Sequence, residues 1–447
     1  MEEATILILD SGARGHVLAK AYEKSKDVKK IIVAPGNDFI SFNAKKETIA
    51  DKNCSLKNLE TILDISKKYN PDLIDVAQDD ALGIGAVNFL QYNGFNVFGP
   101  VKNASKIESD KIFSRGLCAS SNIPCPGFKS FNSEGKAISY VQNLYSDNSS
   151  RLIFVKAQGL CSGKGALSGK NLSMTISNIK KMKEFETAGK NFLIEEGLVG
   201  EEFSFFAICD GKTFKTFKSA QDNKLLYNFD NGPQTGGMGG HSPALVTKNL
   251  EFDIKEKFIQ NTLMGLNNRR IKYCGILYAS GMLSQNKIFL IEHNARWGDP
   301  EAQTILSGYK GDYFNLVQSC LNQTLAQTKI DEDDLTRVCI VGSSRGYPYD
   351  YNDILGKRIF GIEEAVKLKD IEIFGAGIEM EDGKFYVNGG RLFSVVGSGK
   401  NILEARQKAY EAISLIHVEG NNLHYRTDIG FRDVERFLTD SFNDPID

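Results

Sequence analysis

The sequence predicts a multidomain protein of mixed α/β and α+β class. We expect a doubly wound parallel sheet at the N-terminus, a central α+β region and a small mixed C-terminal domain. Three observations support this prediction: strands and helices alternate over residues 1–103, strands come in pairs from about residue 124, and a charged stretch at 329–334 precedes a last set of strands. Alternation favours a parallel sheet, whereas paired strands favour an antiparallel one.

The first domain is expected to span residues 1–103. Its short apolar runs, each ending near Gly, Pro or Asp, are predicted strands at 6–9, 31–34, 73–77 and 96–98. Helices are predicted between them at 17–23 and 81–92. A single helix over residues 103–119 is then expected to link this domain to the next.

The central domain is expected over residues 104–328, with a mobile, lid-like lobe at about 124–194. Its predicted strands are 153–155, 192–194, 203–208 and 213–217, followed by a hairpin of 276–283 and 288–291 around the turn 284–286. The C-terminal domain, 329–447, is expected to hold strands at 337–341, 372–374, 384–386 and 393–396 and a helix at 402–415.

The composition excludes several classes of protein. The chain has 54 Lys+Arg against 56 Asp+Glu, so no global charge draws it to nucleic acid or an anionic membrane. Its eight Cys form no C-x-x-C pair, which indicates reduced thiols rather than zinc. No apolar run approaches the ~18–20 residues of a membrane span, and the acidic start shows no signal peptide. We expect a cytoplasmic protein without nucleic-acid or membrane partners.

Two lysines stand where a polyphosphate could bind. A predicted strand delivers Lys156, and a Gly/Ser loop at 159–165 carries Lys164 between two glycines, Gly163 and Gly165. Small residues let backbone amides approach phosphates closely. The loop is not a Walker A loop, because Gly165 stands where Ser or Thr is required. The alternative is an ordinary hairpin loop with exposed lysines.

The segment that follows the predicted strand 288–291, if it continues as a strand, carries two hard oxygen ligands. Glu292 and Asn294 are two positions apart, so they point to the same face, and their oxygens suit Mg²⁺. His293 faces the other side and is expected to be a core histidine. Arg296 follows in a loop, where its guanidinium could bind a substrate carboxylate bidentately. Trp297 is expected to pack beneath it.

Three further segments point to ligand binding less strongly. The strand-to-helix turn 10–16, with Arg14, could bind an anion, or it is a plain turn. The carboxylates of 195–202 could accept hydrogen bonds from adenine or ribose, or they form a charged turn. Residues 232–240 contain five glycines, so this segment is either shaped around a ligand or disordered.

Together these features are suited to ATP-dependent activation of a carboxylate by positioning and electrostatics, without a nucleophilic side chain. The same residues resemble the glycinamide ribonucleotide synthetase (phosphoribosylamine–glycine ligase) family, ATP-grasp ligases of purine synthesis. The most specific matches are 155–165, 232–239 and 296–301; supporting ones are 34–37, 98–100, 219–222, 389–391 and 428–430.

The resemblance implies that ATP phosphorylates glycine and that the amine of 5-phosphoribosylamine attacks the glycyl phosphate. It implies an ATP site between two ATP-grasp lobes, a Mg²⁺ or Mn²⁺ ion on Glu292 and Asn294, and a monomer or weak homodimer. The residues implied to meet ATP are Lys111, Lys156, Gly163, Gly165, Glu195, Leu198 and Glu202.

The resemblance also assigns the substrate side. Arg296 would hold the carboxylate, and Lys164 and Asp222 would act beside it in catalysis. The residues implied to contact substrate, besides Arg296, are Ser11, Gly12, Arg14, Asp79, Gly232, Pro233, Thr235, Gly236, Gly237 and Met238.

Two turns depart from the family pattern and keep an alternative open. The family's G-S-G-G-R-E-H corresponds to residues 10–16, where Asp10 replaces the first Gly and Gly15 replaces the Glu. The family's G-P-E-A-P-L corresponds to residues 77–82, which contain Asp79 and Asp80. As in this branch of the family, strand 277–283 lacks a metal carboxylate. The alternatives are an ATP-grasp ligase for another amine or carboxylate, a Rossmann-type oxidoreductase, and a non-catalytic ATP-binding protein.

Overall fold

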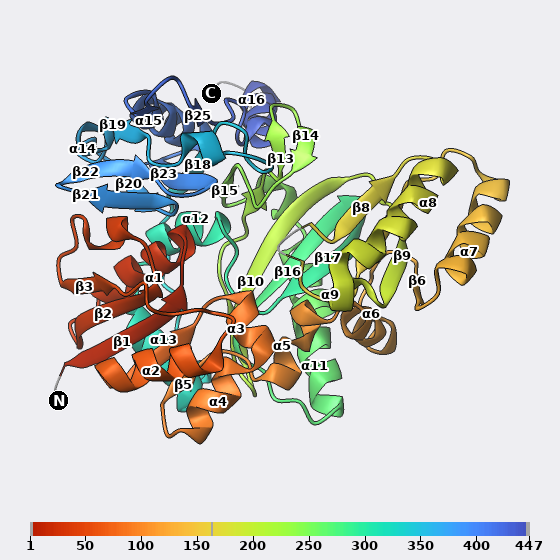
Figure 1. The fold of residues 1–447 in the computed structure, drawn as a ribbon, viewed down its shortest axis with the longest axis horizontal. Helices are drawn as coiled ribbons and strands as arrows, with labels where there is room; N and C mark the ends of the chain where they lie inside the picture. The colour runs from red at the N-terminus through yellow and green to blue at the C-terminus, as the bar shows by residue number, and fades with distance from the viewer. Residues whose placement is uncertain (1–2, 162–163, 444–447) are drawn as a thin grey trace.

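The computed structural model describes residues 3–161 and 164–443 (Figure 1). Its N-terminal part is a five-stranded sheet in the order β3-β2-β1-β4-β5, in which every pair is parallel. The predicted doubly wound sheet is therefore confirmed. The strands are β1 Ala4–Asp10, β2 Val28–Pro35, β3 Glu47–Ala50, β4 Leu73–Val76 and β5 Val97–Phe98, with helices α1 Ala13–Glu23 and α2 Leu59–Tyr69.

Two predicted helices are wrong, because each is broken in two. The expected 81–92 helix is α3 Asp79–Ile84 followed by α4 Ala86–Tyr92, since Gly85 takes a left-handed φ of 96° between them. The expected 103–119 helix is α5 Lys102–Ser109 followed by α6 Lys111–Ser120. Asp110 is extended between them, and its carboxylate accepts the Phe113 N–H at 3.0 Å, which caps α6.

The central region contains two antiparallel sheets (Figure 1). One has the order β6-β9-β7-β8 and shares an apolar cluster with α7 Glu134–Asp147 and α8 Leu172–Lys181. The other has the order β11-β10-β16-β17, and its β16–β17 hairpin turns at Gln285 and Asn286, as predicted. The strands are β6 Phe128–Phe131, β7 Ile153–Ala157, β8 Ala166–Gly169, β9 Phe192–Glu196, β10 Glu201–Asp210, β11 Phe214–Thr216, β16 Cys274–Ser284 and β17 Lys287–Asn294.

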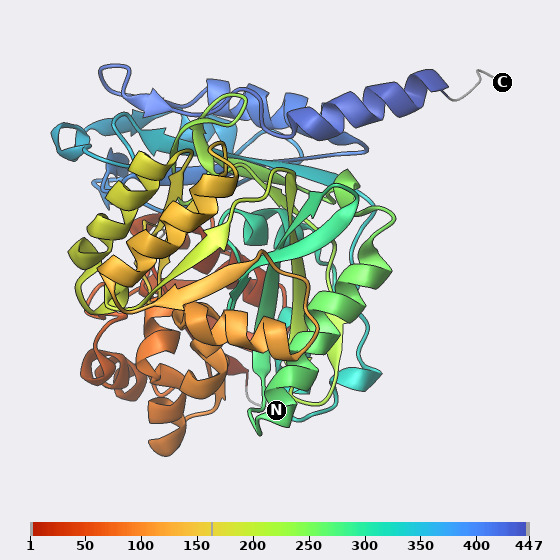
Figure 2. The same ribbon diagram turned by 90° about the vertical axis from the view of Figure 1, so that its right-hand side faces the viewer.

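The C-terminal sheet draws strands from both sides of the charged stretch 329–334. In the order β12-β15-β18-β23-β20, it joins β12 Gln221–Asp222 and β15 Gly239–Ser242 to β18 Thr336–Ser344, β23 Arg391–Gly399 and β20 Ile371–Gly375. Helix α15 Ile402–Ser414 packs on β18 and β23, and α16 Phe431–Asn443 runs along the top of the molecule (Figure 2). The strands that flank the glycine-rich segment thus belong to the C-terminal sheet.

The remaining elements complete the three parts. The C-terminal part has a second sheet in the order β21-β22-β19-β24. The elements not yet named are α9 Glu186–Gly189, α10 Glu251–Ile254, α11 Asn261–Asn268, α12 Glu301–Gly308, α13 Tyr313–Leu321, α14 Ile362–Ala365, β13 Leu225–Tyr227, β14 Asn231–Gln234, β19 Arg358–Phe360, β21 Ile378–Glu381, β22 Lys384–Val387, β24 His417–Val418 and β25 Leu423–His424.

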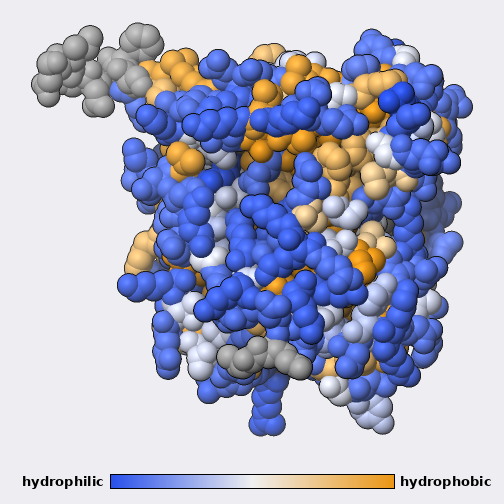
Figure 3. All heavy atoms as spheres, turned by 90° about the vertical axis from the view of Figure 1, so that its left-hand side faces the viewer, coloured by the Kyte–Doolittle hydropathy of each residue, from blue (hydrophilic) through white to orange (hydrophobic). Residues whose placement is uncertain are grey.

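The surface seen in Figure 3 is mostly hydrophilic, and its hydrophobic side chains gather in the upper part, over the C-terminal domain. Within the described ranges, none of the helices combines the length and apolarity that a membrane span requires.

The N- and C-terminal parts meet at a buried histidine. Nδ1 of His16, on α1, accepts the Gly375 N–H of β20 at 3.0 Å, and its ring packs edge-on against Phe39 and Phe374. Burial, helped by Lys20, lowers the pKa of His16 from 6.5 to about 3. The approach is close, because a Cβ on Gly375 would lie 2.4 Å from Cβ of Phe39.

We predict that this histidine makes the fold acid-sensitive. Between pH 6.5 and about 3 the unfolded chain binds a proton at His16 that the folded chain does not, so stability falls as the pH drops. At pH 5 this loss is roughly 2 kcal/mol. His16→Asn keeps an acceptor for Gly375 without titrating, so its denaturation midpoint should fall less than that of the wild type between pH 7.5 and 5. Equal pH dependence of the two midpoints would contradict the assignment.

Candidate active site

A cavity of about 420 Å³ lies where the three parts of the chain meet. Its walls come from the β1–α1 and β4–α3 turns, helices α5 and α6, strands β7, β9 and β17, and Arg391 of the C-terminal sheet. Most of the site residues expected from the sequence line it: Ser11, Gly12, Arg14, Asp79, Lys111, Lys156, Gly165, Glu195, Asp222, Thr235, Gly236, Glu292, Asn294 and Arg296.

The remaining predicted residues fall elsewhere. Gly163 lies outside the described residues. Lys164 is exposed, and its N–H is bonded to the Cys161 carbonyl at 2.9 Å. Met238 is fully buried in the core. The others that do not line the cavity are Leu198, Glu202, Gly232, Pro233 and Gly237.

A buried ionic triad forms one wall. The Glu195 carboxylate of β9 accepts Nε and Nη2 of Arg115 at 2.7 and 3.0 Å and pairs with Nζ of Lys156 at 2.6 Å. Burial alone would raise the pKa of Glu195, but Lys156 and Arg115 lower it to about 2. The Glu195 carboxylate therefore fixes the Lys156 ammonium at the cavity wall, and its contact with adenine stays a prediction.

The end of β17 carries the predicted metal ligands. Glu292, His293 and Asn294 all belong to the cavity lining, but His293 is buried and its ring nitrogens are bonded to Ser114 and Thr262 at 2.9 and 2.8 Å. Burial alone would raise the pKa of Glu292, but Lys224 and other cavity cations lower it, so its carboxylate is ionised. Among the described residues, Nδ2 of Asn294 is buried without a hydrogen-bond partner. The Glu292 carboxylate and the Asn294 amide oxygen are the kinds of ligand that a divalent cation takes, with phosphate oxygens and water completing its shell, whereas the unpaired Nδ2 is a donor and does not bind a metal.

Two guanidinium groups converge on one carbonyl. The Trp297 carbonyl accepts Nη1 of Arg296 and Nη1 of Arg14, each at 3.1 Å. Arg296 also pairs with Glu108 at 2.8 Å, and burial raises the pKa of Glu108 to about 7 although Arg296 opposes the shift. Within the described part of the chain, the buried Nε of Arg296 has no partner. Arg296 is thus held in place with donor capacity to spare for a carboxylate.

The β1–α1 turn already contains an anion. The buried Asp10 carboxylate accepts the N–H groups of Gly12 and Gly15 at 2.7 and 3.2 Å and pairs with Arg14 at 2.6 Å. Gly15 is required beside it, because a Cβ there would lie 2.9 Å from Cβ of Asp10. Two amides of this turn and part of the Arg14 guanidinium are therefore already bonded within the chain.

Acidic groups gather near the glycine-rich loop, residues 232–239. Asp222 has a buried Oδ1 for which the described residues provide no partner, and burial and Glu301 raise its pKa well above the usual range. Glu301 accepts hydrogen bonds from Ser204 and Tyr278 at 2.9 and 2.7 Å. Glu202, expected at the ribose, is paired with Lys224 at 2.7 Å, and its contact with ribose stays a prediction.

The glycine-rich loop is held from the C-terminal domain. Nη1 of Arg391 donates to the Gly236 carbonyl at 2.7 Å, and the Gly236 N–H donates to the Tyr347 hydroxyl at 3.0 Å. Arg391 also pairs with Asp299 at 2.9 Å. Gly237 has a φ of 113°, and a Cβ there would lie 2.6 Å from Pro300, so the loop approaches the 296–301 segment as closely as glycine allows.

Sequence reasoning gave no role to several charged or polar residues that line the cavity. Glu108, Arg115 and Arg391 have partners distant in the chain, which no local pattern reveals, whereas Arg391, Lys224 and Glu301 lie within or beside the recognised motifs 389–391, 219–222 and 296–301. These residues are Glu108, Arg115, Arg391, Lys224 and Glu301.

Comparison with known proteins identifies the family. Models of the phosphoribosylglycinamide synthetase N domain, ATP-grasp (A) domain and C domain match residues 4–108, 109–302 and 337–432. A phosphoribosylamine–glycine ligase of Fusobacterium nucleatum is 35% identical over 434 residues, which cover 95% of this chain and 98% of that protein. A crystal structure of the Thermotoga maritima ligase, 28% identical, covers 95% of this chain and 100% of its own, with a TM-score of 0.79.

Longer relatives contain the same region. The chain is 35% identical to the trifunctional purine biosynthetic protein adenosine-3 of chicken and of human, and spans 43% and 42% of their lengths. The family models cover the described sheets and the cavity between them. The chain belongs to the phosphoribosylglycinamide synthetase family of ATP-grasp enzymes, which are ATP-dependent ligases.

Proposed function

We propose that the protein joins glycine to 5-phosphoribosylamine with consumption of ATP, giving glycinamide ribonucleotide, ADP and phosphate in purine synthesis. The observation that carries this proposal is the convergence of three kinds of group in one cavity. These are the phosphate-facing lysines Lys111 and Lys156, the Glu292–Asn294 pair, and Arg296 with its free Nε.

ATP would lie along the wall formed by α6, β7 and β9. Lys111 and Lys156 would contact its phosphates, and Glu195 would orient Lys156. Glu195 and the backbone at Leu198, which lies outside the cavity lining, would meet adenine. Glu202, Gly163 and Gly165 would also contact ATP, and Lys164 would act beside the carboxylate substrate in catalysis. Glu292 and Asn294 would hold Mg²⁺ or Mn²⁺, which would neutralise charge on the transferring phosphoryl group.

The glycine carboxylate would be held by Arg296 beside the phosphates. One carboxylate oxygen attacks the γ-phosphorus, and the bond from phosphorus to the ADP oxygen breaks. The amine nitrogen then attacks the acyl carbon, the bond to phosphate breaks, and the nitrogen loses a proton. The residues position the reactants and compensate charge, and none forms a covalent bond to substrate.

The amine substrate would lie between the N-terminal turns and the glycine-rich loop. Asp222, Thr235 and Gly236 would contact it there, together with Ser11, Gly12 and Asp79, all of which line the cavity. Gly232, Pro233, Gly237 and Met238 would act through the backbone of the loop. Because Asp10 already accepts the Gly12 and Gly15 amides and pairs with Arg14, we propose that this turn shapes the cavity rather than binding a phosphate directly.

A cytoplasmic location, a monomeric or weakly dimeric state, and the absence of nucleic-acid partners remain predictions from the sequence. The proposed reaction does not depend on the location, the oligomeric state or the absence of nucleic-acid partners.

The direct test is ADP release by the purified protein with ATP, Mg²⁺, glycine and freshly generated phosphoribosylamine, omitting each in turn. We expect ADP only when all are present. ADP release that is independent of glycine, or that requires another amine, would overturn the proposed substrates and leave the ligase class standing.

Glu292→Ala should lower turnover at least ~100-fold, because the variant loses metal-held charge stabilisation. The measurement is ADP release at saturating glycine over a range of Mg²⁺ concentrations. Glu411→Ala, an exposed carboxylate on α15, is the matched control and should behave as wild type. Near-wild-type turnover of Glu292→Ala would exclude the metal role.

Arg296→Ala should mainly raise the KM for glycine, by about tenfold or more, because a charge-assisted contact to the carboxylate is lost. Arg296→Lys keeps the charge but not the paired donors, so its KM for glycine should lie between those of the wild type and Arg296→Ala. The KM values follow from initial rates at fixed ATP. An unchanged glycine KM in both variants would place the carboxylate elsewhere.

A further inference from the structure

Contacts outside its own two-stranded sheet determine the position of the β13–β14 hairpin. Leu225–Tyr227 and Asn231–Gln234 form a two-stranded sheet that, within the described residues, is joined to no other strand. Phe229 and Asp230 at its turn both have positive φ, 54° and 53°. A two-stranded hairpin alone is marginally stable in water, so contacts outside it must set its position.

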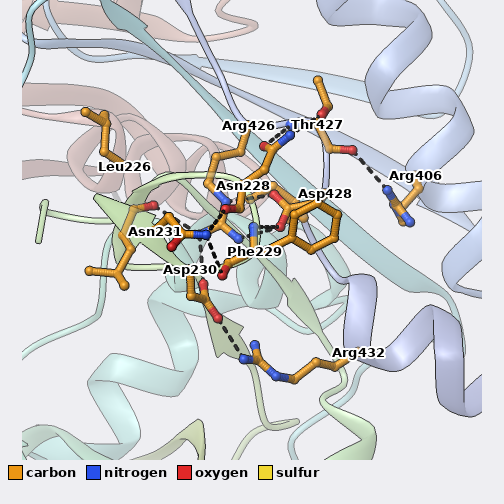
Figure 4. Close-up of polar contacts among 12 residues, drawn as sticks. Leu226, Asn228, Phe229, Asp230, Asn231, Arg406, Arg426, Thr427, Asp428 and Arg432 are labelled. Atoms are coloured by element: carbon orange, nitrogen blue, oxygen red, sulfur yellow. Dashed lines mark hydrogen bonds and ion pairs between the residues drawn. The ribbon is translucent and has the colours of Figure 1, made fainter. Parts of the chain in front are cut away.

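A buried arginine supplies the central contact (Figure 4). Arg426 is fully buried, and its Nη1 donates to Asp230 at 2.9 Å and to the Leu225 carbonyl at 3.0 Å. Its Nε and Nη2 hold Asp428 at 2.8 and 2.7 Å. Arg432, from α16, reaches the second oxygen of Asp230 at 2.7 Å. Burial would raise the pKa of Asp230, but the two guanidinium groups lower it.

Polar contacts extend this anchor along the hairpin. The Asn228 amide donates to Thr427 Oγ1 at 2.7 Å and accepts the Thr427 N–H at 3.0 Å. The Phe229 N–H donates to Asp428 at 2.6 Å, and the Phe229 ring lies edge-on to Phe431. The segment from 426 to 432 therefore fixes both the place and the orientation of the hairpin (Figure 4).

The hairpin leads directly into the cavity. Gln234, Thr235 and Gly236 follow one another along its wall. Both the N–H and the hydroxyl of Thr235 donate to the carbonyl of Lys224, the residue before β13, at 2.8 Å. Glycines impose no conformation of their own, so the shape of the glycine-rich loop depends on what holds its ends.

We infer that Arg426 and Asp230 are positioning residues for the glycine-rich loop, and hence for the amine substrate; this rests on the proposed function. A buried guanidinium that loses one of its carboxylates is strongly disfavoured, so the pair holds the hairpin in one arrangement. The proposed ATP contacts come from helix α6 and from β7 and β9, and these two strands belong to another sheet. Loosening the anchor should therefore act on the amine substrate and spare ATP.

The test compares Asp230→Ala, which leaves Asp428 on Arg426 and so preserves the fold, with Asp230→Glu. In Asp230→Ala we expect the KM for phosphoribosylamine to rise about tenfold while the KM for ATP stays within about twofold, because small displacements of positioning groups affect rate and binding strongly. Amide hydrogen exchange over residues 225–237 should be about fivefold faster or more. Asp230→Glu should restore most of both values.

The matched control is Asp370→Asn, which breaks the pair of Asp370 with Lys408 at 2.7 Å in the same domain, away from the hairpin. It should leave both KM values and the exchange over 225–237 unchanged. The inference would be overturned if Asp230→Ala left amide exchange over residues 225–237 unaltered. It would also be overturned if exchange became faster while the KM for phosphoribosylamine stayed the same, or if the KM values for phosphoribosylamine and ATP rose equally. If the wild type shows no glycine-dependent ADP release, the proposed function fails and exchange alone decides whether Asp230 anchors the loop.

Discussion

The Glu195 carboxylate holds Arg115 and Lys156 together at one wall of the cavity, and the three side chains come from three elements, β9, α6 and β7. Removing an ion from water costs several kcal/mol unless a partner of opposite charge and further hydrogen bonds replace the solvent. The triad can therefore exist only when the helix and the two strands are correctly placed. Placing them also delivers the Lys156 ammonium to the cavity, so the same contact serves structure and site.

The same constraint recurs around the cavity. Arg14 is neutralised by Asp10, Arg296 by Glu108, and Arg391 by Asp299. The Arg296 and Arg391 pairs join segments that are distant in the chain, whereas Arg14 and Asp10 belong to one turn; the Trp297 carbonyl links Arg14 to Arg296. Cations kept at a cavity by internal carboxylates are fixed in position before any substrate arrives, which is the condition for electrostatic catalysis without reorganisation.

The C-terminal domain completes the site rather than lying beside it. It shares its main sheet with β12 and β15, it contributes Arg391 to the cavity, and it holds Gly236 through Tyr347 and Arg391. The glycine-rich loop thus lies between strands of that sheet, although it precedes the domain's other strands in sequence. Its order comes from partners that appear more than a hundred residues later.

Local sequence patterns determined the parallel sheet, the face of β17 that carries the metal ligands, and the family. Alternation of apolar runs and helices indicated the parallel sheet, the period of two on β17 placed Glu292 and Asn294 on one face and His293 in the core, and the family motifs indicated the ligase. These features depend on backbone periodicity or on contiguous residues. Only the tertiary structure decided which charges pair. Asp230 and Arg426 are 196 positions apart, and nothing local tells which of 54 basic residues will meet which of 56 acidic ones. Their pairing follows from burial, because each charge must find the partner that the packed elements bring within reach.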